Sequence, residues 1–150
     1  MQAIPGCVLA VAGTGPEEPS LAVLGGSIHV LGALPHEQIV QLLAQADAYC
    51  LPTEYAEGFP TTLLEAAACR CPIVTTRTAG TGELLPGGDY AVFLADASTQ
   101  TIRAGLDTLM ADPVAAAARA EKAHENLCSH FTWQAVFATM MEIVNAAKRS

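Results

Sequence analysis

Short apolar runs recur along the first two thirds of the chain, and each run is bounded by Gly, Pro, Asp or Glu. The runs are continuous and lack the strict alternation of a strand that is buried on one face only. They therefore predict short strands covered on both faces, as in a parallel sheet. The predicted strands occupy residues 7–13, 28–32, 48–52, 72–76 and 90–95.

Between these runs the apolar positions follow the helical period, which predicts helices over residues 36–46 and 61–69. From residue 98 onward the pattern is wholly helical, and it predicts a tail of helices rather than further sheet. These helices cover residues 98–110, 113–129 and 132–147. The alternation of strand and helix, followed by a helical tail, indicates an α/β fold.

The length of 150 residues and the 51% share of hydrophobic residues predict one domain over residues 1–150 with a substantial core. No apolar run approaches the roughly 18 residues that a membrane span needs. The start of the chain has no basic leader, so we do not interpret it as a signal peptide. A cytoplasmic location is the resulting expectation.

The formal net charge of −8 argues against binding to nucleic acid or to an anionic membrane, because both need a basic face. The chain has five cysteines, an odd number that cannot all pair within one chain, and we expect them to be reduced and structural. Cys69 and Cys71 flank a single residue, which is not the spacing of a zinc site. We therefore predict no metal site.

The loop over residues 53–60 carries the candidate chemistry. It follows a predicted strand, and ligands of parallel α/β sheets bind where such loops run into helices. The next helix offers its first backbone N–H groups, at Thr61, Thr62 and Leu63, to an anion without any basic side chain. This arrangement predicts a seat for a diphosphate.

Two carboxylates flank that seat. Glu57 precedes the helix and Glu65 lies about one turn inside it, so a close dyad of the glycosidase kind is not expected. Separated carboxylates suit hydrogen bonds to hydroxyl groups on either side of a diphosphate. A sugar on one side and a ribose on the other is the ligand that this pattern favours.

The segment LPTEYAEGFPTTLLEAAACRCPIVTT resembles the donor-binding domain of the group 1 (family four) glycosyltransferases, which have the GT-B architecture of two Rossmann-like domains. LAVAGTGPEE and IHVLGALPHEQIVQLLAQADAYCLP upstream, and GGDYAVFLADAS and HFTW downstream, resemble further family landmarks in the same order. The resemblance covers nearly the whole chain. It implies a Rossmann-like, three-layer α/β domain with a mostly parallel sheet and a helical C-terminal tail.

The resemblance also implies roles for individual residues. Glu57, Gly58, Phe59 and Pro60 would hold the donor sugar, and Glu65 would bind the ribose hydroxyls. The backbone amides of Thr61, Thr62 and Leu63 would bind the diphosphate. Arg77 would be a further diphosphate contact, and a solvated loop arginine is the alternative. The turn at Gly32, Ala33 and Leu34 would border the nucleobase.

The implied donor is a UDP-, GDP- or ADP-linked sugar, with no metal and no cofactor, because the helix dipole and basic side chains carry the phosphate charge. The implied reaction is hexosyl transfer in glycan biosynthesis with retention of anomeric configuration.

Plainer interpretations stay open for several residues. Glu65 also suits a simple favourable interaction with the helix dipole. Glu83 falls where the family has its next Glu, and capping of a short helix is the alternative. The four histidines are scattered, so surface roles are expected for them. A dinucleotide site at Gly13 and Gly15 is not expected, because Glu18 stands where the third glycine belongs.

The sequence departs from the family pattern at its start. Only six residues precede the first predicted strand, too few for the family's first strand and helix, whose Arg and Lys contact the diphosphate. We therefore expect that unit to be missing, which predicts a gap in the sheet, a repaired strand order or an edge that needs a partner. Arg70 also stands where relatives usually have Gly.

The leading functional hypothesis is the donor-binding domain of a glycosyltransferase, inactive without an acceptor domain because the reaction occurs between two domains. The expected partners are the nucleotide sugar and either a second copy or a separately encoded acceptor domain, with membrane contact only through such a partner. One alternative is a stand-alone nucleotide-sugar-binding or interaction module. A second is a sugar-nucleotide epimerase, which is disfavoured because no histidine falls in the motif loops.

Overall fold

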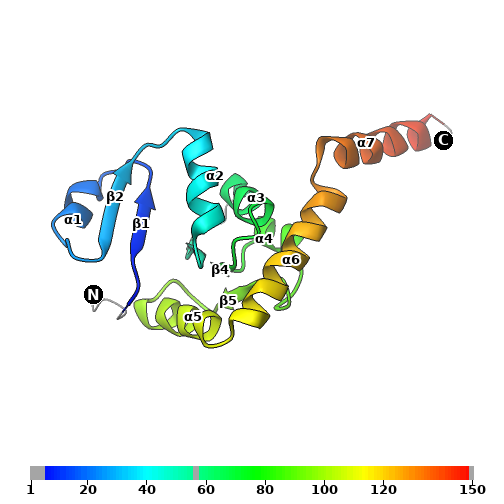
Figure 1. Cartoon of the computed structure of the whole chain (residues 1–150). Coiled ribbons are helices and arrows are strands. Elements are labelled where there is room, and N and C mark those ends of the chain that lie inside the picture. The colour runs from blue at the N-terminus through cyan, green and yellow to red at the C-terminus, as the bar shows by residue number, and fades with distance from the viewer. Residues whose placement is uncertain (1–5, 56–57, 149–150) are drawn as a thin grey trace.

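The computed structural model describes residues 6–55 and 58–148 (Figure 1). In these residues, strands and helices alternate until residue 94, and the chain then continues as helices. The strands are β1 (Leu9–Ala12), β2 (Ile28–Gly32), β3 (Tyr49–Leu51), β4 (Ile73–Thr76) and β5 (Val92–Leu94). The helices are α1 (Glu18–Ala22), α2 (His36–Gln45), α3 (Thr61–Ala68), α4 (Ala79–Leu84), α5 (Thr99–Ala111), α6 (Pro113–His130) and α7 (Trp133–Ala147).

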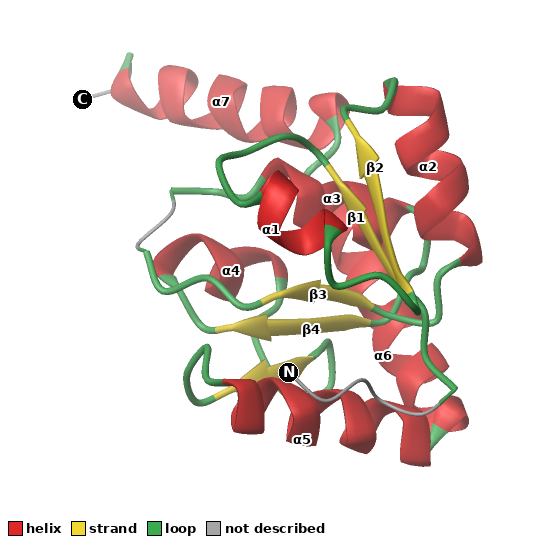
Figure 2. Cartoon of the chain, turned by 90° about the vertical axis from the view of Figure 1, so that its left-hand side faces the viewer, coloured by secondary structure: helices red, strands yellow, loops and turns green. Residues whose placement is uncertain are grey.

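All pairings between the described strands are parallel. The strands form two sheets, one with β1 beside β2 and one with the order β3-β4-β5 (Figure 2). The predicted strands and the α/β class are thus confirmed. The short helices α1 and α4 are additions to the elements that the apolar pattern predicts.

Helices cover both faces of the β3-β4-β5 sheet. On one face, Ile73 of β4 packs in a cluster with Leu43 of α2 and Leu63 of α3. On the other face, Val74 packs with Leu109 of α5. Successive residues of β4 therefore enter different cores, as the pleat of a strand requires. This is the expected three-layer arrangement, and it explains why β4 reads as a continuous apolar run.

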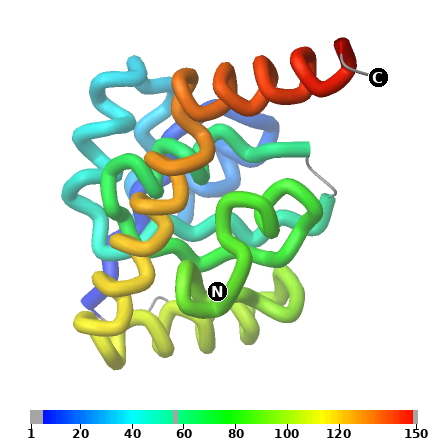
Figure 3. The backbone as a smooth tube through the Cα atoms, turned by 90° about the vertical axis from the view of Figure 1, so that its right-hand side faces the viewer, coloured from blue at the N-terminus to red at the C-terminus, as the bar shows by residue number. Residues whose placement is uncertain are grey.

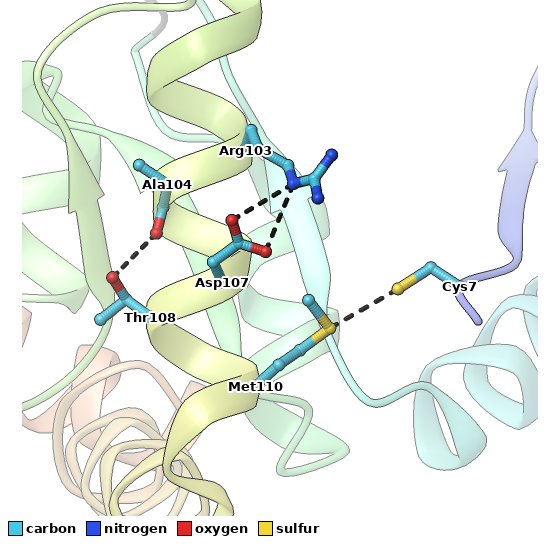
Figure 4. Close-up of polar contacts among 6 residues, drawn as sticks. All are labelled: Cys7, Arg103, Ala104, Asp107, Thr108 and Met110. Carbon is cyan, nitrogen blue, oxygen red and sulfur yellow. Dashed lines mark hydrogen bonds and ion pairs between the residues drawn. The ribbon is translucent and has the colours of Figure 1, made fainter. Parts of the chain in front are cut away.

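The sheet is divided between β1 and β3. Within the described part of the chain, β1 pairs only with β2, and β3 pairs only with β4. Leu9 in β1 is 48% exposed, although its apolar run predicts burial on both faces. Across the break, Cys7 Sγ lies 3.5 Å from Met110 Sδ of α5, on the helix that also carries the Arg103–Asp107 ion pair (Figure 4). Among the described residues the sheet therefore has a gap, with unpaired edges at β1 and β3.

The helical tail binds the body through α6 and then leaves it. His124 Nδ1 lies 3.1 Å from the carbonyl oxygen of Ala67 in α3, and Asn126 Nδ2 donates to the carbonyl of Leu84 in α4 at 2.8 Å. Helix α7 extends away from the rest of the molecule (Figures 1 and 3) and contains no buried residue. No described helix is both long and apolar enough to cross a membrane.

Candidate functional site

The candidate site is built around the amino end of α3, which starts at the carboxyl side of β3. Pro60 is buried and precedes the helix without a side-chain cap. The N–H of Leu63 donates to the carbonyl oxygen of Pro60 at 3.1 Å, and Leu63 is 1% exposed. Thr61 and Thr62 are exposed, and their N–H groups have no partner among the described residues. These two amides are therefore the ones open to an anion.

Three contacts hold the described ends of the loop before α3. Thr76 Oγ1 donates to the carbonyl oxygen of Thr53 at 2.6 Å, which ties the loop to the end of β4. The ring of Phe59 stacks against Phe131 with centroids 5.3 Å apart, which ties the loop to the α6–α7 junction. The carbonyl of Gly58 lies against Gly80 of α4 so closely that no side chain fits at Gly80. The loop is thus anchored from three different elements.

Glu65 faces the region of the predicted nucleobase turn. Its Oε1 atom lies 3.5 Å from Nδ1 of His36, and its side chain is 28% exposed. His36 is the first residue of α2 and follows the turn over residues 32–34, which Gly32 opens with φ +65°. The structure therefore brings together the turn predicted to border the base and the carboxylate predicted to bind the ribose.

Arg77 directly follows β4, at the carboxyl end of that strand. Its guanidinium stacks over the ring of Phe93 in β5, with Cζ 3.9 Å from the ring centroid. It lines a pocket of about 440 Å³ whose lining includes Thr53, Thr78 and Asp96 and no residue of α3. The predicted contact of Arg77 with the diphosphate stays a prediction.

Glu57 lies outside the described residues. Glu83, the other carboxylate that the resemblance singles out, does not cap α4, because Thr78 is the N-cap and accepts from the N–H of Thr81. Glu83 instead lines an apolar pocket of about 330 Å³ together with Phe59, Phe131 and other residues. The capping interpretation of Glu83 is wrong, since Glu83 is near the other end of the helix.

Sequence reasoning missed two residues of this region. His36 was assigned to the surface, and its 71% exposed side chain agrees with that, but its contact with Glu65 joins it to the site. Gly80 is the other, because no helix is predicted around it and its close contact with Gly58 arises from tertiary packing.

Comparison with known proteins decides the family. Residues 1–126 match the family described as glycosyl transferases group 1. This chain belongs to that family. The group 1 glycosyltransferase domain is 36% identical over 151 residues to glycogen synthase of Mycobacterium tuberculosis, covering 97% of this chain and 36% of that protein. It is 31% identical over 136 residues to an MMP alpha-(1->4)-mannosyltransferase of Mycolicibacterium hassiacum, covering 89% of this chain and 33% of that protein.

Solved structures show the same fold. HepE of Anabaena in complex with UDP superposes with a TM-score of 0.82 at 19% identity, over 96% of this chain and 42% of that one. Sucrose-phosphate synthase from Thermosynechococcus elongatus superposes with a TM-score of 0.83 at 19% identity, over 97% of this chain and 40% of that one. The group 1 domain described here therefore spans well under half the length of these relatives.

Proposed function

We propose that this domain binds the nucleotide-diphosphate sugar of a hexosyltransferase that acts in glycan biosynthesis with retention of anomeric configuration. The observation that carries the proposal is the contact of Glu65 with His36, next to the turn over residues 32–34. It supports one continuous nucleoside subsite beside the open amides of Thr61 and Thr62. The complexes of HepE with UDP and with UDP-glucose support the same ligand class.

Within this proposal, the amides of Thr61 and Thr62 take the diphosphate, and Glu65 accepts hydrogen bonds from the ribose hydroxyls. Leu63 contributes less than its neighbours, because its N–H already donates to Pro60. Glu57, Gly58, Phe59 and Pro60 keep their assignment to the donor sugar, and Gly32, Ala33 and Leu34 border the base. No protein metal or cofactor is needed for binding of this kind, since helix amides carry the charge.

The proposed reaction also needs an acceptor-binding domain, because sugar transfer requires donor and acceptor to be held together in one cleft. A separately encoded acceptor domain or a second copy of the chain would supply the opposite wall of the cleft. We also propose a cytoplasmic location, which the five free cysteines support because reducing compartments keep thiols unpaired.

Calorimetric titration with UDP, GDP and ADP, and with their sugars, tests the donor site. We expect one of these nucleotides to bind and Glu65→Ala to weaken that binding about tenfold or more, since a hydrogen bond to a charged group is lost. The matched control is Glu37→Ala, an exposed carboxylate in the first turn of α2. The proposal is rejected when no nucleotide binds the folded wild-type chain.

A second candidate is a nucleotide-sugar-binding module without catalysis. The stacking of Arg77 on Phe93 favours it, because that cation is engaged by a ring of β5 and lines a pocket without residues of α3. The two functions are separated by mixing the chain with a nucleotide sugar and a candidate acceptor domain and measuring glycosylated product. A donor-binding domain of a transferase should yield product, whereas a pure binding module should bind the nucleotide and yield none.

A further inference from the structure

We infer that His36 is a positioning residue for the nucleoside: it holds the carboxylate of Glu65 in the orientation that binds the ribose hydroxyls. The inference rests on the proposed function and adds a residue to the same site.

The two side chains come from different helices. His36 opens α2 and Glu65 lies in α3, and the helices pack against one another through the cluster that contains Leu43 and Leu63. The shared core thus fixes the two backbones relative to one another, so the nearness of His36 and Glu65 is a property of the fold. Only side-chain torsions remain to be set by the contact.

Glu65 needs such a partner. Its side chain is 28% exposed, so the protein encloses the carboxylate only in part and the choice among staggered rotamers remains to be set. An Nδ1–H group directed at Oε1 restricts that choice, and it does so in either form of the ring, because a neutral imidazole can carry its proton on Nδ1. The 3.5 Å separation is longer than a well-formed hydrogen bond, and we infer that a change in side-chain torsion shortens it when nucleotide binds.

The other side of the imidazole is available to ligand. His36 is 71% exposed, and among the described residues Glu65 is its single polar contact. His36 follows the turn over residues 32–34 and Pro35 in the chain and contacts Glu65, so it adjoins both the subsite proposed for the base and the one proposed for the ribose. Substitution of His36 should therefore weaken the contribution of the ribose hydroxyls to nucleotide affinity and leave that of the diphosphate unchanged.

The test compares one nucleoside diphosphate with its 2′,3′-dideoxy counterpart in calorimetric titrations, using whichever of UDP, GDP or ADP binds the wild-type chain. We expect His36→Leu to weaken binding of the normal nucleotide about 3- to 10-fold, which is the range of one hydrogen bond. Binding of the dideoxy nucleotide should change less than about twofold. Glu65→Gln should show the same selectivity with a larger loss.

His36→Asn provides the rescue, because its amide N–H occupies nearly the position of Nδ1, and we expect it to restore most of the affinity. Glu37→Gln, the adjacent exposed residue, is the control for a change in the charge of α2. Circular dichroism confirms that each variant is folded.

Two results overturn the inference while the proposed function stands: equal losses for both nucleotides with His36→Leu, or no loss with His36→Leu where Glu65→Gln does lose affinity. A folded wild-type chain that binds no nucleotide contradicts the proposed function itself, and the inference is rejected with it.

Discussion

Arg70 ends α3 in the left-handed backbone conformation, with φ +53°. The N–H of Cys71 donates to the carbonyl of Ala66 at 2.9 Å, and the N–H of Arg70 donates to that of Ala67 at 3.2 Å. These two bonds form a Schellman motif, which normally has glycine at the left-handed position. The side chain compensates in part, because Nε of Arg70 donates to Glu121 Oε2 of α6 at 2.6 Å.

Exchange of Arg70 for Gly or Ala separates backbone strain from the ion pair. Both variants lose the contact with Glu121, but only Arg70→Gly relieves the left-handed backbone. We therefore expect Arg70→Gly to melt roughly 2 to 4 °C above Arg70→Ala in thermal unfolding. Equal melting temperatures for the two variants would show that the backbone conformation at residue 70 is not strained.

The same pair predicts a pH dependence. The hydrogen bond from Arg70 holds the pKa of Glu121 below its usual value. A lowered pKa in the folded state adds stability above the unfolded value, and this contribution is lost as pH falls through the folded value. Because both side chains are about half exposed, we expect the effect to be small and to weaken with salt.

The thiols should differ in reactivity. Burial raises the pKa of Cys71 to about 12, so little thiolate forms near neutral pH. Cys128 is exposed on α6. In alkylation at pH 8 followed by mass spectrometry, we expect Cys128 to be modified much faster than Cys71 in the native chain, with the rates converging in denaturant. Equal native rates would mean that the core around Cys71 opens readily.

At the scale of elements, α4 and the loop before α3 are coupled through Gly80. A Cβ at Gly80 would collide with the carbonyl of Gly58, whereas a Cβ at Gly82 would meet only Nη1 of Arg77 at 3.9 Å. The two glycines lie in the same short helix, so they form a matched pair. Helix propensity favours Ala over Gly at both positions.

We therefore expect Gly80→Ala to displace the loop and to weaken nucleotide-sugar binding at least tenfold, a loss typical of misplaced binding groups. Gly82→Ala should bind within about twofold of the wild-type chain and be slightly more stable. Calorimetric titration and thermal unfolding of both variants provide the measurements. Unchanged nucleotide-sugar affinity in a folded Gly80→Ala variant would show that the position of the loop before α3 does not affect the donor site.

The apolar pattern predicted β3, β4 and β5 because these strands contribute to cores on both faces. It overestimated their length: residues 90–95 were predicted, but β5 is Val92–Leu94, since Tyr90 already donates its N–H to Gly87 in a turn. Helix α1 was missed because its five residues are too few to show a period. Helix α4 was missed because two glycines interrupt it.

The candidate site was only partly readable for a related reason. The helix amides of Thr61 and Thr62 follow from the position of the loop within a parallel fold. The contact of His36 with Glu65 joins helices distant in sequence, so no local pattern carries it. The engagement of the Leu63 amide by Pro60 likewise depends on the tight first turn of α3.

At the scale of the whole molecule, two places expose groups that folded proteins usually cover: unpaired strand edges and large apolar side chains. One is the gap in the sheet, where β1 and β3 each leave an edge unpaired within the described residues. The other is α7, where Trp133, Phe137 and Ile143 are 87%, 64% and 64% exposed. A helix of this composition in water promotes association, even for a chain with a net charge of −8.

We predict that α7 contributes to association and little to folding. The double substitution Phe137→Glu and Met140→Glu removes apolar surface from a helix without buried residues, and glutamate is a good helix former. The melting temperature should therefore change by about 1 °C or less, because surface changes away from packed features are usually near neutral. Sedimentation velocity over a concentration series should show less self-association than for the wild-type chain.

Leu109→Ala is the opposite control, because Leu109 is 4% exposed in the core beneath α5. Its loss should cost about 2 to 4 kcal/mol of unfolding free energy without lowering the tendency to associate. Were the α7 double variant instead to melt far below the wild-type chain, α7 would have to pack on the body more closely than its exposure indicates. The contrast between the two variants thus assigns the apolar surface of α7 to contacts between molecules and that of α5 to the fold.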